Sequence, residues 1–355
     1  MSDDSALKDV IALSGPFIKS VVDTFVTPKL EEVKKRLSNG AKKNSVPNES
    51  NFTEYFFRSY KKYSIINTLV FNNSQRLLKD IYIPLTLKQN SENEKKYKIE
   101  EFPLRIVVHY DKVLIMDTAG MGKSTLLKRI FLDVIDRSIG IPVLIELRRL
   151  SKDKKIVDEI HEQLNSINKN FNDKLTLELI NEGDFVFFFD GFDEIALSER
   201  ENVTKDIQQF ISKAGNNKFF LTSRPESALT SFGDFQQFTI EPLKKKEAFE
   251  LLKKYDKGGV LSKLLIKKLE DTELNNIEEF LTNPLLVSLL FTAFEHKQTI
   301  PFKKHIFYRQ VYDANFESHD LTKGDTFSRD KYSGLDIATL GELYQGKYHL
   351  NFSYW

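Results

Sequence analysis

The chain has 355 residues, enough for roughly two or three domains. A formal net charge of +1 gives no overall reason to expect nucleic acid as a specific partner, and the lack of cysteine excludes disulfides, thiol nucleophiles and thiolate zinc sites. The acidic start MSDDSALKDV is unlike a basic secretory signal, and no uncharged apolar run reaches the length of about 18 residues that spans a membrane. We therefore expect a cytoplasmic protein.

The N-terminal region predicts two helices that form a hairpin. Apolar residues recur at helical spacing over 6–26, and a glycine-proline pair at 15–16 interrupts them. Thr27 followed by Pro28 is typical of an N-cap and a first helical position, which would start a second helix through Leu37.

A linker rich in Asn, Ser, Gly and Pro follows at 38–50, so we treat residues 1–50 as a region of their own. The simplest interpretation is a packing or dimerisation element. The alternative is a membrane-active or self-associating effector or adaptor that engages an effector partner. Charged residues interrupt the apolar run and argue against a membrane role, without deciding it: Lys8, Asp9, Lys19 and Asp23.

Residues 51–110 form a second region that leads into an α/β core. The pattern predicts, in order, helices over 52–79, a strand over 81–87, a charged loop over 88–98 and a strand over Leu104–His109. Pro84 indicates an edge position for the first of these strands, because proline cannot donate to a neighbouring strand. Aromatic residues mixed with basic ones near residue 60 favour an amphipathic helix over a nucleic-acid surface.

The segment VLIMDTAGMGKSTLL at 113–127 predicts a phosphate-binding loop between a buried strand and a helix. Its two glycines allow successive N–H groups and a helix N-terminus to surround a polyphosphate. Lys123 is expected at the β- and γ-phosphates and Ser124 at Mg²⁺. Asp117 stands where the usual pattern has its first glycine, and aspartate tolerates unusual backbone dihedrals. The predicted nucleotide-binding residues are Thr118, Ala119, Gly120, Met121, Gly122, Lys123, Ser124 and Thr125.

From residue 112 onward strands and helices alternate, which predicts a five-stranded parallel sheet covered by helices. After the phosphate-loop strand, strands are expected at 142–147, 185–190, 218–223 and 235–241, and intervening helices at 153–165, 174–182 and 199–213. The remainder is mostly helical, with predicted helices at 244–255, 260–269, 275–281, 284–295 and 303–317. No internal repeat of the solenoid type is seen.

Two further segments carry side chains suited to phosphate chemistry. In FVFFFDGFDE, Asp190 ends a buried strand and is expected to hold Mg²⁺, while Asp193 or Glu194 orients or deprotonates an attacking water. In FFLTSRPES, Arg224 follows a strand and is expected beside the γ-phosphate. A third segment, FLTNPLLVSLL, begins a helix with Asn283 as N-cap and Pro284 at the first position.

These four segments, in this order, resemble the NACHT domain of the STAND signalling NTPases, and members related to bacterial NLR-like defence proteins look nearest. The resemblance covers about 104–290. It implies an ASCE-type P-loop sheet at 111–242 in which the strand before Arg224 lies between those before Lys123 and Asp190. It also implies that Pro284 lies against the nucleotide base, within a helical subdomain at 243–300 that precedes a winged-helix-like region at 301–355.

The resemblance further implies an ATP-driven switch with ATP/ADP and Mg²⁺ as cofactors. ADP would hold a closed form, to which a histidine such as His305 or His319 contributes, and ATP would favour an open form that assembles into a homo-oligomer. Hydrolysis would be slow. The setting would be bacterial innate immunity, with an unknown trigger such as a phage component and residues 1–40 as effector or adaptor.

Two alternatives stay open: a nucleotide-dependent scaffold with negligible turnover, and another P-loop enzyme such as a small-molecule kinase. Most proteins of this kind continue into a repeat-containing sensor, whereas the sequence ends at Trp355. It is therefore expected to be either a short-tailed member or a fragment.

Overall fold

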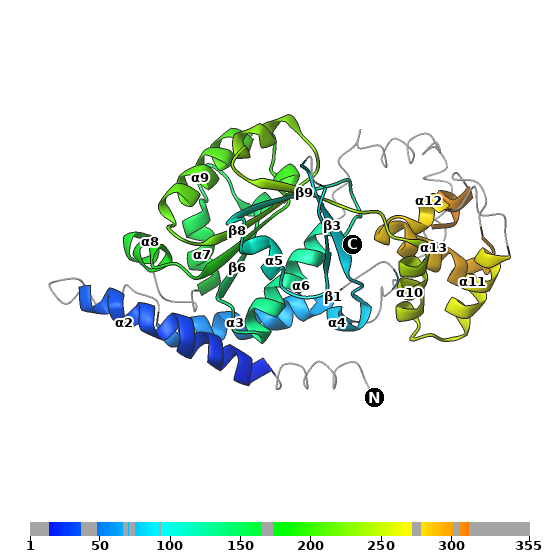
Figure 1. The fold of residues 1–355 in the computed structure, drawn as a ribbon, viewed down its shortest axis with the longest axis horizontal. Coiled ribbons are helices and arrows are strands. Elements are labelled where there is room, and N and C mark those ends of the chain that lie inside the picture. Colours follow the sequence, from blue (N-terminus) through cyan, green and yellow to red (C-terminus); the bar gives the residue numbers. More distant parts are fainter. Residues whose placement is uncertain are drawn as a thin grey trace, which may run out of the picture. The chain divides into compact units, whose positions relative to one another are not determined.

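The computed structural model describes residues 14–36, 48–66, 70, 75–91, 94–164, 173–271, 278–300 and 306–311 (Figure 1). The chain divides into two compact units. The sheet unit comprises Met1–Ile65, Leu77–Lys79 and Pro84–Glu241, and the helical unit comprises Ile66–Arg76, Asp80–Ile83 and Pro242–Trp355. The finer division into five regions stays a prediction.

The sheet unit is built on a seven-stranded sheet in the order β4-β3-β9-β5-β8-β7-β6. The last five of these are parallel, which confirms the predicted parallel sheet. Strand β8 lies between β5 and β7, as the resemblance implies, so the carboxyl ends of all three meet at one edge. The parallel strands are β5 (Lys112–Met116), β6 (Ile141–Glu146), β7 (Phe185–Asp190), β8 (Lys218–Ser223) and β9 (Gln236–Ile240).

Two antiparallel strands extend the five parallel ones: β3 (Leu85–Gln89) pairs with both β9 and β4 (Lys96–Ile99). Strand β3 confirms the second half of the strand predicted over 81–87, whereas β4 was not predicted. The predicted charged loop at 88–98 is therefore partly strand. The prediction of an edge strand from Pro84 was wrong, because Pro84 precedes β3 and does not interrupt its pairing. Residues before it form a short helix, α4 (Leu78–Ile81).

The predicted strand at 104–109 was also wrong, since this segment begins with the helix α5 (Leu104–Val107). Ile106 and Val107 are buried, whereas Leu104 and Val108, four positions apart, are exposed. Burial therefore follows a helical spacing, which an apolar run this short does not distinguish from a strand. The helical prediction for 52–79 holds through α3 (Glu49–Ser64), after which come the short strands β1 (Ile65–Ile66) and β2 (Arg76–Leu77).

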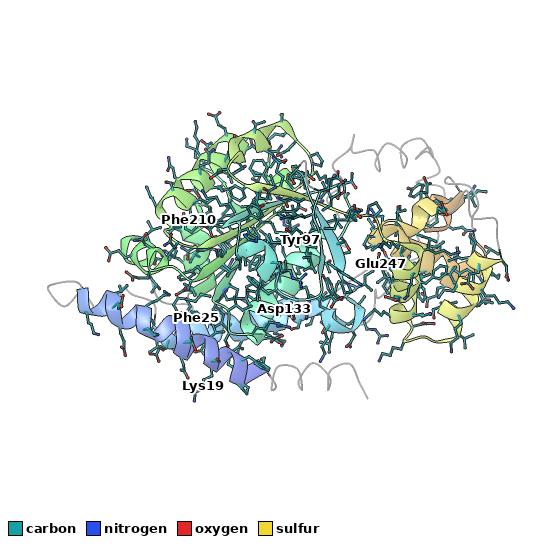
Figure 2. All side chains as sticks on the ribbon, in the orientation of Figure 1. Lys19, Phe25, Tyr97, Asp133, Phe210 and Glu247 are labelled. Carbon is teal, nitrogen blue, oxygen red and sulfur yellow. The ribbon has the colours of Figure 1, made fainter. Side chains whose placement is uncertain are left out.

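Phenylalanines on β7 connect the sheet to helices on both of its faces. Phe187 packs edge-on against Phe210 of α9 (Arg200–Lys213), with ring centroids 5.0 Å apart. Figure 2 labels the Phe210 side chain. Phe188 points to the opposite face, where it meets Phe131 of α6 (Lys123–Asp136) at 6.1 Å. Alternation along one buried strand thus fixes a three-layer core. The predicted helices α7 (Ile156–Leu164) and α8 (Asp173–Asn181) are also present.

The N-terminal helix is continuous over residues 14–36, so the predicted break before Thr27 was wrong. A π-helical turn, η1 (Val22–Val26), runs directly into α2 (Thr27–Arg36), and Thr27 N–H bonds to the carbonyl of Val22. Pro28 lacks the N–H of an ordinary helical turn, and the wider π turn before it lets the helix continue. Its apolar stripe is buried, comprising Ile18, Val21, Val22, Val26, Leu30 and Val33.

The helical unit contains α10 (Lys245–Tyr255), α11 (Val260–Glu270), α12 (Glu278–Leu281) and α13 (Pro284–Lys297), at the predicted positions. Asn283 caps α13 by accepting from the N–H groups of Leu285 and Leu286 at 2.9 and 3.4 Å, with Pro284 in the first turn, as predicted. Residues 306–311 are helical, and the rest of the predicted 303–317 helix and winged-helix region lies outside the described residues. In the described part of the chain, no helix has the length and apolar character needed to cross a membrane.

Candidate nucleotide-binding site

The predicted phosphate loop runs from the end of β5 to the start of α6. Gly120 and Gly122 have positive φ angles of 81° and 89°, conformations that glycine adopts without steric cost. The loop thereby turns over the N-terminus of α6, a helix of 14 residues whose first N–H groups have no partner within the helix. This end of α6 can bind an anion.

Lys123 lies across the loop that precedes it. Its Nζ donates to the carbonyl oxygens of Asp117 and Thr118 at 2.6 and 2.8 Å. Burial lowers the pKa of Lys123, while the neighbouring carboxylates of Asp193 and Asp117 oppose that shift. The Lys123 ammonium is thus held by neutral carbonyl oxygens. Negatively charged phosphate oxygens would accept stronger, charge-assisted hydrogen bonds from it and could replace these carbonyls.

Ser124, Asp190 and Thr222 meet at the edge of the sheet. The Asp190 carboxylate accepts from the Ser124 hydroxyl at 3.0 Å and from the Thr222 hydroxyl at 2.7 Å. The Thr222 hydroxyl also accepts from Gly191 N–H at 3.0 Å, which fixes its orientation. Burial raises the pKa of Asp190, and the two hydroxyl donors counteract that effect.

This donor set fits Mg²⁺. The described residues contain no cluster of three or more His, Cys, Asp or Glu side chains that could cage a metal. Mg²⁺ typically uses one or two protein oxygens together with substrate phosphates and water. One hydroxyl and one carboxylate beside a phosphate loop meet that requirement, with Ser124 and Asp190 as the residues that would hold the ion.

The two acidic residues after β7 have different partners. Asp193 is paired with Arg224: its Oδ1 accepts from the Arg224 backbone N–H and its Oδ2 from Nε, both at 3.0 Å. The Glu194 side chain lies over Gly191, where an added Cβ would come within 3.1 Å of it. Gly191 has a φ of 76°, a conformation that favours glycine, and any larger residue there would also crowd the Glu194 side chain.

Glu194 is half-exposed and is approached by Arg148, with Oε2 and Nη1 separated by 3.7 Å. Arg148 also pairs with Glu146 at the end of β6, at 2.8 Å. Burial raises the pKa of Glu194, and so does the nearby Asp190, while Arg148 lowers it. Among the predicted site residues, Glu194 is thus an acid with raised proton affinity beside the Ser124–Asp190 pair.

Residues 111–258 match the NACHT domain family. This stretch is a NACHT domain. It is a nucleotide-binding P-loop NTPase domain, and the four predicted motifs lie within it or, for Pro284, shortly after it.

The other comparisons add only distant likenesses. No curated protein matches the chain. Among solved structures it is similar to domain III of the replication initiation protein DnaA from Thermotoga maritima, at 14% identity and a TM-score of 0.38, over 59% of this chain and 88% of that one. Cdc6p from Pyrobaculum aerophilum gives 15% identity and a TM-score of 0.37, over 72% and 67%. AMPPCP-bound DnaA from Aquifex aeolicus gives 13% and 0.32, over 69% and 92%.

The NACHT domain also contains an arginine that the motifs did not predict. Arg200, at the start of α9, pairs with Glu226 at 2.6 Å and donates to the carbonyls of Asp193 and Ile195, both at 2.9 Å. It therefore joins the acidic turn after β7 to the loop after β8. The only sequence feature that could have indicated Arg200 is its position soon after the acidic motif. For Arg148, the only such feature is its position just after a strand.

Not every predicted site residue is brought to this edge. Pro284 belongs to the helical unit, so its contact with a nucleotide base stays a prediction. His305 and His319 lie outside the described residues.

Proposed function

We propose that the NACHT domain binds ATP with Mg²⁺ and hydrolyses it slowly to ADP and phosphate. The observation that carries the proposal is the convergence of three chain segments on one sheet edge: Ser124 and Thr222 both bond to Asp190, and Lys123 lies beside them in a glycine loop. Mg²⁺, when bound, would neutralise charge on the β- and γ-phosphates.

Binding begins with Lys123. Its ammonium exchanges the carbonyls of Asp117 and Thr118 for oxygens of the β- and γ-phosphates. The Arg224 side chain is 47% exposed, and the contact with Asp193 engages only its Nε and backbone N–H. Its two terminal nitrogens are thus available to the γ-phosphate, where they stabilise developing negative charge.

Glu194 is the proposed general base, and Asp193 is a positioning residue for Arg224. A water attacks the γ-phosphorus, its proton passes to the Glu194 carboxylate, and the bond from the γ-phosphorus to the β–γ bridging oxygen breaks. The raised pKa of Glu194 makes its carboxylate a stronger base than that of an ordinary glutamate. Asp193 is less suited because both of its oxygens already accept hydrogen bonds from Arg224.

The same site supports a nucleotide-controlled switch. ADP would favour a closed form, and ATP, through Arg224, an open form able to assemble into a homo-oligomer. Such a shift requires the two nucleotides to bind the two forms with different affinities. The chain passes from β9 into the helical unit at Pro242, which gives the site a direct covalent route to that unit. The resemblance to NLR-like proteins supports the further proposal that this switch acts in bacterial defence against phage, with the N-terminus acting on an effector partner in the cytoplasm.

The test begins by identifying the nucleotide retained by the purified full chain. Phosphate release is then measured with Mg²⁺ for the wild type, for Asp190→Asn and for the control Asp111→Asn, an exposed acid at the opposite end of β5. We expect slow release that Asp190→Asn abolishes and the control retains. Bound nucleotide without measurable release would instead support a scaffold, and no bound nucleotide would overturn the proposal.

Assembly is tested separately, by particle mass at micromolar protein with ADP and with a non-hydrolysable ATP analogue. A larger mass with the analogue supports the switch. The same mass with both nucleotides would contradict the assembly step without affecting the ATPase proposal.

A further inference from the structure

Asp117 occupies the position at which the usual phosphate-loop pattern has its first glycine, and it makes bonds that glycine cannot. Its carboxylate accepts from two backbone N–H groups: Oδ1 from Thr118 at 2.7 Å and Oδ2 from Ile240 at 2.9 Å. Its own N–H donates to the carbonyl of Ser223 at 3.2 Å, a backbone bond that glycine would also make. One residue therefore ties the loop to the ends of both neighbouring strands, β8 and β9.

The hydrogen bond from the Ile240 N–H to the Asp117 carboxylate extends the pairing of β5 with β9 beyond the last backbone pair. Pairing of β5 with β9 extends to Ile115 opposite Phe238, and β5 ends at Met116 as the chain turns into the loop. Ile240 is only 3% exposed, so its N–H needs an acceptor from the protein. The Asp117 carboxylate supplies that acceptor where the β5 backbone no longer can.

Asp117 also contacts Lys123, the residue proposed to bind phosphate. Its carbonyl oxygen accepts from Lys123 Nζ at 2.6 Å. When Lys123 moves to a phosphate, the peptide after Asp117 loses a charge-assisted bond, and the carboxylate of the same residue remains on Ile240. Two residues beyond Ile240, at Pro242, the chain enters the helical unit.

We infer that Asp117 is a positioning residue that couples occupancy of the phosphate loop to the end of β9. The inference rests on the proposed nucleotide site. Phosphate binding orders the loop, and the ordered loop strengthens the bond from the Asp117 carboxylate to Ile240. By reciprocity, the same bond strengthens nucleotide binding by an equal factor.

The readout is hydrogen exchange at the Ile240 amide in the full chain, without nucleotide and at saturating non-hydrolysable ATP analogue with Mg²⁺. In the wild type we expect the analogue to slow this exchange by about tenfold, the size of effect that one hydrogen bond supports. In Asp117→Gly, which restores the usual motif, the analogue still binds but no longer slows exchange at Ile240. The affinity of this variant for the analogue should fall by the same factor by which the analogue slows Ile240 exchange in the wild type.

Asp117→Asn provides a second variant of unchanged shape. Its amide has a single acceptor oxygen for two N–H donors, so it keeps one contact and loses the other, and an intermediate ratio is expected. Asp234→Asn is the matched control, because Asp234 pairs with Lys112 and ties the same β5 strand to the segment before β9 at the opposite end. It should behave as the wild type.

The ratio of the Ile240 exchange rate without nucleotide to the rate with the analogue distinguishes coupling from a merely structural role of Asp117. If Asp117→Gly speeds exchange equally with and without analogue, or if the wild type binds the analogue without slowing exchange at Ile240, the coupling is disproved while the nucleotide site stands. A wild-type chain that binds no analogue overturns the proposed function, and this inference with it.

Discussion

The two sides of the site are held together in different ways. The phosphate loop is stabilised by contacts close in sequence, such as that of Lys123 with the Asp117 carbonyl six residues earlier, with Asp117 as its link to other strands. The acidic side is assembled from separate segments. Asp190 accepts a hydrogen bond from Ser124, 66 residues away in the sequence, and Asp193 accepts one from Arg224, 31 residues away. Changes in the loop should therefore act mainly on binding, and changes on the acidic side should act on catalysis and on one another.

The largest effect is expected for Glu194→Gln. Removing the proposed base should lower the turnover number by about a hundredfold to ten-thousandfold and leave nucleotide affinity nearly unchanged. The measurement is single-turnover phosphate release beside nucleotide titration. Asp193→Asn is the matched variant, and it should cause a smaller loss because an asparagine oxygen still accepts one Arg224 donor. If Asp193→Asn were the more damaging of the two, the roles of the two acids would have to be exchanged.

Lys123→Ala should act on binding instead. Loss of a charge-assisted contact to phosphate is expected to weaken affinity about tenfold to a hundredfold, because such bonds contribute roughly 1.5 to 3 kcal/mol. Isothermal titration with the ATP analogue measures it. Lys205→Ala, which removes an exposed lysine paired with Glu201, controls for loss of charge. Unchanged affinity in Lys123→Ala would contradict the phosphate-loop assignment.

The same contrast explains what could be predicted from the sequence. Locally determined features were accessible: the loop glycines, the Asn283 cap and strands such as KFFLTS at 218–223 each follow from adjacent residues. The Phe-rich run at 185–190 predicted a strand buried on both faces, and the structure has one.

The features that escaped prediction depend on distant partners. Strand β4 (KYKI) has little apolar character, and its backbone pairs with β3. In α5, the buried side chains are those that lie on one face of a helix, which the sequence of so short a segment does not specify. The role of Arg200 depends on Glu226, 26 residues away, and no local pattern encodes that pair. The contact of Asp117 with Ile240 spans 123 residues, so the sequence showed the departure from the motif without its consequence.

Arg200→Ala tests whether the acidic side is one network. The change leaves Glu226 and two carbonyls without their donor, and Arg200 is only 18% exposed, so unfolding free energy should fall by about 1 to 3 kcal/mol. Turnover should fall with it, because the turn that carries Glu194 loses its anchor. Denaturant unfolding and phosphate release measure the two effects. Glu226→Gln keeps an acceptor for Arg200, so it should cause smaller losses of both unfolding free energy and turnover. Full turnover in Arg200→Ala would mean that the turn carrying Glu194 keeps its shape without the arginine.

The smallest effect is expected for Arg148→Ala, and it concerns pH. Glu194 must be deprotonated to accept a proton, so turnover should fall as the pH drops through its raised pKa. Arg148 lowers that pKa from a distance of 3.7 Å, so its removal raises the pKa further and moves the acid limb of the pH–rate profile to higher pH. Because both side chains are partly exposed, solvent screens the pair, and the loss at acid pH should be about two- to fivefold, with the rate at alkaline pH unchanged. A loss that is equal at every pH would show that Arg148 positions Glu194 and does not tune it, which would make even this exposed pair part of the mechanical network of the acidic side.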